Sequence, residues 1–87
     1  MKYRTILVVD DDESLRRVTQ LQLEEAGYAV LTAASGDAAL QAIEEEAPAL
    51  VITDLKMPGM SGLDLLKKVR ECAPQVMVLM ITAFGTL

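Results

Sequence analysis

The chain has 87 residues and a mass of 9.4 kDa, which predicts one small domain over residues 1–87 and excludes a multidomain enzyme. Its formal net charge of −5 argues against direct contact with nucleic acid, because a phosphate backbone selects basic surfaces. There is no histidine and a single cysteine, Cys72, so an internal disulfide, the usual zinc sites and a histidine-based catalytic triad are all excluded.

Four short aliphatic runs, bounded by polar residues, glycine or proline, have the composition of β-strands. They cover residues 6–9, 28–31, 50–52 and 76–81. The first, third and fourth runs are continuously apolar, which is typical of strands covered on both faces. The pattern therefore predicts a parallel sheet between layers of helices.

Helical segments are expected between these strands, over residues 13–26, 36–47 and 62–72. In the first segment, an apolar side is expected from Leu15, Val18, Leu21 and Leu23. Gly27 follows this segment, where a left-handed helix cap is common.

The other two helices carry start and stop signals. Ser35 can cap the second helix, and Pro48 ends it before the third strand. Ser61 and Asp64 have the spacing of a capping box at the start of the third helix. The alternation of strands and helices predicts an open, doubly wound α/β sheet, and such sheets bind ligands at the carboxyl ends of their strands.

Acidic side chains occur at two of these strand ends. Asp10 and Asp11 follow the first apolar run, and Asp54 follows the third. Two unit charges about 4 Å apart repel by roughly 4 kcal/mol at an effective dielectric constant near 20, so such a cluster favours a bound cation. Oxygen ligands of this kind suit Mg²⁺, which often shares its coordination sphere with phosphate.

A simpler interpretation is that these acids only end their strands and cap the following helix. We favour it for Asp12, whereas for Asp10, Asp11 and Asp54 together a metal site is the better hypothesis. Thr82 ends the fourth strand and would place a hydroxyl on the same rim, where it could donate to a phosphoryl oxygen.

The sequence resembles the receiver domains of two-component response regulators along its whole length. The resemblance rests on three stretches in the right order, residues 8–12, 51–62 and 80–83. Residues 82–86 resemble most the receivers of enhancer-binding transcriptional activators. The resemblance implies a flavodoxin-like sheet with strand order 2-1-3-4. The family's final strand and helix, which carry a lysine and an aromatic switch residue, have no counterpart after Leu87.

The resemblance also implies roles for individual residues. Asp54 would be the phosphoacceptor, and Asp10, Asp11 and Asp54 with the backbone carbonyl of Lys56 would organise Mg²⁺. Thr82 would be the switch hydroxyl. The phosphoryl donor would be a sensor histidine kinase. The domain would catalyse its own phosphorylation and would not turn over substrate as a conventional enzyme does.

Two other functions remain open from the sequence. Residues 6–12 also fit the opening motif of a haloacid dehalogenase-type phosphohydrolase, in which Asp10 and Asp12 would act. Alternatively, the chain is a non-catalytic receiver-like module that forms a homo-oligomer through an exposed edge strand and apolar sheet surface. A cytoplasmic location is expected, since no secretory signal is evident and the run at residues 6–9 is too short to span a membrane.

Overall fold

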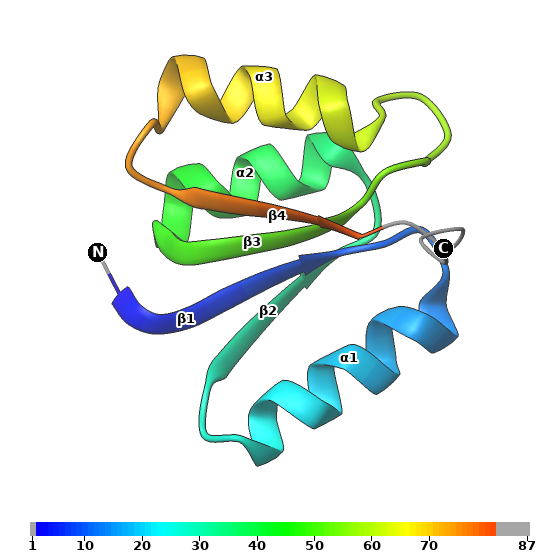
Figure 1. Ribbon diagram of the computed structural model, residues 1–87, viewed down its shortest axis with the longest axis vertical. Coiled ribbons are helices and arrows are strands. Elements are labelled where there is room, and N and C mark those ends of the chain that lie inside the picture. The colour runs from blue at the N-terminus through cyan, green and yellow to red at the C-terminus, as the bar shows by residue number, and fades with distance from the viewer. Residues whose placement is uncertain (1, 82–87) are drawn as a thin grey trace.

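A computed structural model describes residues 2–81, with side chains from residue 5 onward. The elements are β1 (Lys2–Val9), α1 (Glu13–Glu25), β2 (Ala29–Ala33), α2 (Gly36–Glu46), β3 (Pro48–Asp54), α3 (Gly62–Cys72) and β4 (Met77–Ile81). All strand pairs are parallel, in the order β2-β1-β3-β4. Helices α2 and α3 cover one face of the sheet and α1 lies on the other (Figure 1). The predicted fold class and strand order are confirmed.

The strands extend beyond the aliphatic runs that predict them. β1 begins at Lys2, and β2 is shifted toward its carboxyl end, up to Ala33. β3 runs from Pro48 to Asp54, so the acid expected just after this strand is its last residue. The extra residues pair with neighbouring strands, as Asp54 does with Ile81 of β4, and these backbone hydrogen bonds carry the strands past the apolar runs.

The predicted helix caps are present. Gly27 has a φ of 99° after α1, and the Tyr28 N–H donates to the Leu23 carbonyl at 3.1 Å, as in a Schellman motif. The hydroxyl of Ser35 accepts the Ala38 N–H at the start of α2. These caps fix where each helix begins or ends, and therefore where the neighbouring strand ends lie.

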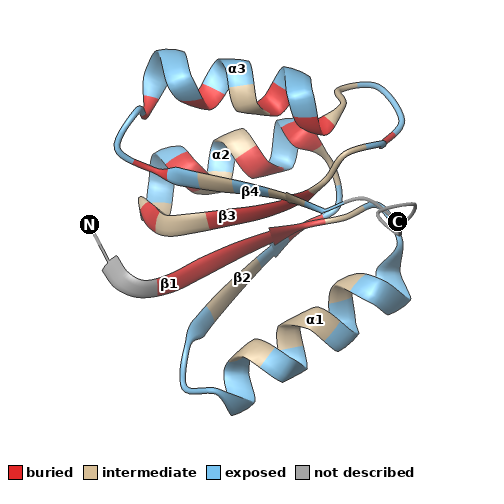
Figure 2. Ribbon diagram, in the orientation of Figure 1, coloured by how far each residue is buried: buried red, intermediate tan, exposed pale blue. Residues whose placement is uncertain are grey.

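The core is unequal on the two sides of the sheet (Figure 2). On the side of α2 and α3, eleven buried residues form one cluster, which includes Leu7, Val51 and Leu65. On the side of α1, the buried cluster among the described residues consists of Ile6, Val8 and Ile52. The face that α1 covers is thus the thinner half of the core.

This inequality corrects two expectations about burial. In β4, burial alternates, with side chains of Met77, Leu79 and Ile81 exposed by 70%, 52% and 49%. The predicted apolar side of α1 is also half exposed at Leu15, and α1 contains no buried residue. Both results follow from incomplete cover on the α1 face of the sheet. Within the described residues, β4 is an edge strand and no second helix packs beside α1.

No helix within residues 2–81 is both long and apolar enough to cross a membrane.

Candidate functional site

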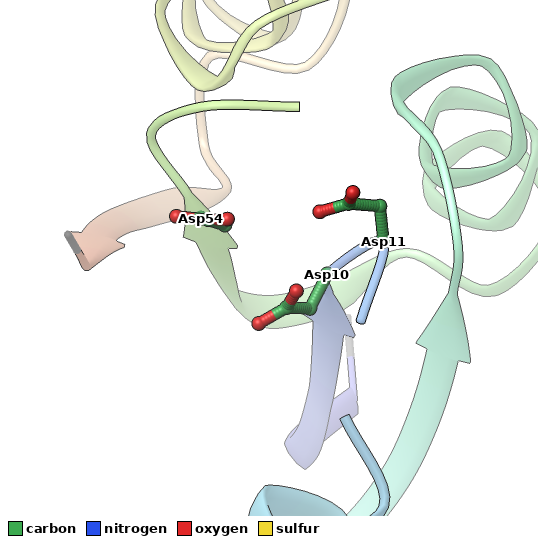
Figure 3. A group of neighbouring side chains, drawn as sticks. All are labelled: Asp10, Asp11 and Asp54. Atoms are coloured by element: carbon green, nitrogen blue, oxygen red, sulfur yellow. The ribbon is translucent and has the colours of Figure 1, made fainter. Parts of the chain in front are cut away.

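Three carboxylates meet at the carboxyl ends of the two central strands. Asp10 directly follows β1, Asp11 comes next in the chain, and Asp54 ends β3. Because β1 and β3 are parallel neighbours, their ends lie side by side, and one carboxylate oxygen from each acid lies within 4.8 Å of the other two. Figure 3 shows the three side chains around a common space. The structure therefore brings together the acids that the sequence predicts as metal ligands.

The environment of Asp10 disfavours its negative charge. Partial burial raises the pKa of its carboxyl group above the ordinary value, and the neighbouring charges of Asp54 and Asp11 raise it further. A hydrogen bond from the Asp12 N–H acts in the opposite direction. A cation would relieve both the desolvation and the repulsion, so the electrostatics of the cluster favour a bound metal ion.

The turn after β1 is fixed by hydrogen bonds around Asp10. Its carboxylate accepts the Asp12 N–H at 2.9 Å, while its backbone carbonyl accepts from the Arg16 guanidinium at 2.8 Å. Asp12 is the N-cap of α1, with its carboxylate accepting the Leu15 N–H. The structural role that the sequence favours for Asp12 is confirmed, and the contact of Arg16 with Asp10 has no signal in the sequence.

Hydrogen bonds of the surrounding backbone fix the position of Asp54. The buried hydroxyl of Thr53 donates to the Asp54 carbonyl at 3.0 Å, and the Leu55 N–H donates to the Ile81 carbonyl at 2.9 Å. At Gly62 a Cβ atom would lie 2.4 Å from the Asp54 carbonyl oxygen, closer than van der Waals contact allows. The close approach of Gly62 therefore needs the absence of a side chain, a requirement that the sequence does not reveal.

The loop between β3 and α3 carries the next candidate ligand. Lys56 is exposed in this loop and Met57 is buried in the core cluster below it. Gly59 has a φ of 76°, as expected for the third position of a type II turn. The proposed role of the Lys56 carbonyl as a metal ligand stays a prediction. Thr82, the predicted switch hydroxyl, lies outside the described residues.

A cleft of about 150 Å³ adjoins the acid cluster. It is lined by Asp10 and Asp54 together with Val8, Leu15, Thr19, Ile52 and Ile81. A larger cleft of about 550 Å³ lies between α2 and α3 and contains none of the three acids. The convergence of carboxylates, rather than cavity size, marks the functional site.

The donor set fits a hard divalent cation. Three carboxylates from two strand ends offer oxygen atoms and no nitrogen or sulfur ligand, which is the preference of Mg²⁺. The partial burial of Asp10 and Asp54 beside the exposed Asp11 also leaves one side of the cluster accessible to solvent. The cluster lies at the carboxyl edge of a parallel α/β sheet, where such folds bind ligands, and Mg²⁺ held by carboxylates commonly shares its coordination with phosphate.

Comparison with known proteins identifies the family. Residues 6–87 match the family described as the response regulator receiver domain. The chain is 40% identical over 80 residues to the alkaline phosphatase synthesis transcriptional regulatory protein PhoP of Bacillus subtilis, covering 92% of this chain and 33% of PhoP. It is 36% identical over 87 residues to the sporulation initiation phosphotransferase F of the same organism, covering 100% of this chain and 70% of that protein. The chain belongs to the response regulator receiver domain family, the phosphoacceptor modules of two-component signalling.

Solved structures agree with this assignment. The response regulator TrrA of Thermotoga maritima, in complex with Mg²⁺ and BeF, superposes with a TM-score of 0.89 at 35% identity, covering 94% of this chain and 71% of that chain. The chemotaxis protein CheY4 of Vibrio cholerae gives a TM-score of 0.90 at 34% identity, covering 97% of this chain and 72% of that chain. The chain spans about one third of the length of the first curated relatives.

The alternative of a haloacid dehalogenase-type phosphohydrolase is wrong. The chain belongs to a different family, and the second acid that this alternative requires, Asp12, is engaged as the N-cap of α1. The acid that joins Asp10 and Asp11 in space is Asp54, which the alternative leaves without a role.

Proposed function

We propose that Asp54 is the phosphoacceptor of this receiver domain and that Asp10, Asp11 and Asp54 hold the Mg²⁺ ion that phosphoryl transfer requires. The observation that carries the proposal is the convergence of the three carboxylates within 4.8 Å at the ends of β1 and β3. Two further ligand assignments belong to it, the backbone carbonyl of Lys56 for the metal and the hydroxyl of Thr82 for a phosphoryl oxygen.

The chemistry is a displacement at phosphorus by an oxygen atom of the Asp54 carboxylate. A new O–P bond forms, while the bond from phosphorus to the donor's leaving group breaks and its electron pair leaves with that group. The leaving group is the imidazole of a phosphohistidine or the acetate of acetyl phosphate. The product is an aspartyl phosphate on Asp54.

The protein contributes mainly positioning and charge compensation. The Asp54 backbone is fixed by the hydrogen bonds at Leu55 and Thr53, so the point from which its carboxylate projects is set before the donor arrives. A bound Mg²⁺ ion would neutralise the charge shared by the acids and the transferring phosphoryl group. Without that compensation, three carboxylates would repel an anionic donor.

The donor we propose is a sensor histidine kinase acting in the cytoplasm. Support comes from the family assignment and from the relatives, which include transcriptional regulatory proteins and a phosphotransferase by name. The domain would accept one phosphoryl group and pass on a signal, without conventional enzymatic turnover. No direct contact of this chain with nucleic acid or membrane is part of the proposal, in keeping with its net charge of −5.

Acetyl phosphate provides the direct test. Incubation with acetyl phosphate and Mg²⁺ should add one phosphoryl group, detected by intact-mass spectrometry and located on Asp54 by peptide mapping. The variant Asp54→Asn should remain unmodified, because an amide oxygen is a poor nucleophile. Chelation of Mg²⁺ should abolish the modification of the unaltered chain. Phosphorylation that persists in Asp54→Asn would refute the assignment.

A homo-oligomer is a second proposal, favoured by the exposed edge. The apolar side chains of Met77, Leu79 and Ile81 are exposed on β4, the edge strand of the described sheet, and Leu15 of α1 is also exposed. Burying such a surface against a second copy would stabilise both chains. Size-exclusion chromatography with light scattering should show a dimer or larger species, and a stable monomer at all concentrations would contradict the proposal.

A further inference from the structure

Helix α2 and the loop after Asp54 touch at Gly36 and Met60. Gly36 is the first residue of α2 and is buried, and Met60 lies in the loop between β3 and α3. A Cβ atom at Gly36 would lie 2.5 Å from the Met60 Sδ and 2.9 Å from its Cβ and Cγ. Non-bonded carbon atoms prefer about 3.5–4.0 Å, so no side chain fits at position 36 while Met60 occupies its place.

Rotation of the Met60 side chain would not relieve this contact. Rotation about the side-chain bonds moves Sδ and Cγ, but Cβ is attached directly to the backbone. The distance of 2.9 Å to Cβ therefore requires the loop backbone at Met60, or the start of α2, to move by more than half an ångström to reach the preferred separation of about 3.5 Å.

The conformation of Gly36 does not explain why a glycine stands there. The described glycines with positive φ are Gly27 and Gly59, so Gly36 has a backbone that other residues adopt. Within a helix, alanine is favoured over glycine by about 1 kcal/mol. The contact with Met60, rather than the backbone geometry, is therefore what makes the missing side chain necessary.

Movement at Met60 would be transmitted to the phosphoacceptor. Met60 lies two residues before Gly62, whose N–H donates to the Leu55 carbonyl at 2.9 Å. A Cβ at Gly62 would lie 3.0 Å from the Leu55 Cα and 2.4 Å from the Asp54 carbonyl oxygen, so Gly62 and the end of β3 are in direct backbone contact. If the loop before Gly62 is pushed away from α2, either its backbone path changes or the contact between Gly62 and the end of β3 is lost.

We infer that Gly36 and Met60 form a positioning pair, in which close contact with α2 sets the path of the 55–61 loop and thereby the placement of the Asp54 carboxylate for phosphoryl transfer. The inference rests on the proposed function of Asp54. Neither residue reaches the reacting atoms, and both act through the loop backbone. Figure 1 shows the start of α2 and the loop before α3 at the same end of the sheet.

The test is a double-mutant cycle with Gly36→Ala, Met60→Gly and the variant carrying both changes, because only glycine at position 60 removes the Cβ atom that contacts position 36. The measured quantity is the rate of phosphorylation by acetyl phosphate at increasing Mg²⁺ concentration. Gly36→Ala should lower the maximal rate by roughly 10-fold, within the 100-fold that a misplacement of about 1 Å can cost. In the double variant, the absence of a Cβ atom at position 60 leaves room for alanine at position 36. The rate should therefore return to within about twofold of Met60→Gly alone, because the two changes are coupled.

The amide NMR shifts of Leu55 and Gly62 give a second measurement, which is independent of phosphorylation. They should change in Gly36→Ala and return toward the values of Met60→Gly in the double variant. If these shifts respond as expected but the unaltered chain accepts no phosphoryl group, the proposed function fails while the positioning contact stands. Unchanged shifts in Gly36→Ala, or purely additive effects in the cycle, would overturn the inference.

Gly27→Ala serves as the matched control. Gly27 has a φ of 99°, where alanine is strained, and it lies after the carboxyl end of α1, at the opposite edge of the sheet from the acids. This change should reduce the free energy of unfolding while leaving the phosphorylation rate of the folded protein unaltered. An equal loss of rate in Gly27→Ala would show that general destabilisation, and not loop placement, explains the effect of Gly36→Ala.

Discussion

Asp10 illustrates how a candidate metal ligand can lower the stability of the metal-free fold. Its carboxylate is partly buried and lies near three like charges, so its pKa is raised above 3.8. A raised carboxyl pKa means that the folded state binds the proton more readily than the unfolded state. The contribution of Asp10 to stability is therefore most favourable at low pH and declines as the pH rises above 3.8 through the folded-state pKa.

Replacing this charge should stabilise the metal-free protein. In Mg²⁺-free buffer at pH 7, Asp10→Asn should raise the free energy of unfolding by about 1 kcal/mol, since the like-charge repulsion is removed, and the gain should shrink at high salt. The amide oxygen can still accept the Asp12 N–H, so the turn is retained. The measurement is urea denaturation with and without Mg²⁺.

The same variant should lose most of the stabilisation that Mg²⁺ gives to the unaltered chain, because ligand binding to the folded state adds to its stability. Asp12→Asn is the matched control: asparagine caps helices as well as aspartate, and Asp12 is outside the group of three acids. If Asp10→Asn responds to Mg²⁺ as strongly as Asp12→Asn, Asp10 is not a ligand.

At the level of single residues, the sequence predicts the side chains at strand ends well. It does not predict the contacts that a residue makes with a distant segment of the chain. The positions of Asp10, Asp11 and Asp54 follow from the strand pattern, because parallel strands deliver their ends to one edge. The contact of Arg16 with the Asp10 carbonyl depends on the rotation of α1, which no local pattern encodes. The need for glycine at position 36 depends on a loop that arrives from another part of the chain.

Among the elements, α3 has the most explicit start signal. The Ser61 hydroxyl accepts the Asp64 N–H at 3.1 Å, and the Asp64 carboxylate accepts the Ser61 N–H at 3.2 Å, which completes the predicted capping box. These two hydrogen bonds hold the pKa of Asp64 below its ordinary value of 3.8. The helix begins directly after the loop that follows Asp54, so this cap also fixes the end of that loop.

The cap should make α3 sensitive to acid. A lowered carboxyl pKa gives stability that is fully present above pH 3.8 and is lost as the pH falls through the folded-state pKa. Asp64→Asn, which stays neutral, should therefore be less stable than the unaltered chain at pH 7, and the difference should close as the pH falls below 3.8 through the folded-state pKa. Urea denaturation across this pH range measures it, and a difference that is the same at both ends would contradict the charged cap.

The elements also show where patterning misleads. The apolar run that becomes β4 predicts burial on both faces, yet Leu79 is 52% exposed because β4 is at the edge of the described sheet. The composition of a strand reports the environment that its side chains favour, whereas burial depends on which elements pack against it. The existence and order of all seven elements could be predicted from the sequence. Which parts of each sheet face are covered by a helix could not.

On the scale of the whole molecule, the sheet divides the core into a thick and a thin layer. Val8 and Val9 are neighbours on β1 that point to opposite faces, with exposed fractions of 3% and 1%. Val9 belongs to the cluster under α2 and α3, while Val8 belongs to the smaller cluster beneath α1. The two positions thus offer the same side chain, on the same strand, in layers of different depth.

Truncation to alanine should distinguish these layers. Val9→Ala should cost about 2–3 kcal/mol of unfolding free energy, because the dense layer cannot collapse onto the cavity. Val8→Ala should cost closer to about 1 kcal/mol, since the partly buried neighbours Leu23 and Leu50 can move toward the space. Urea denaturation of both variants at one protein concentration makes the comparison. Equal losses would show that the layer beneath α1 is packed as tightly as the layer beneath α2 and α3. The apolar side chains of α1 and β4 that are exposed here would then be buried in solution.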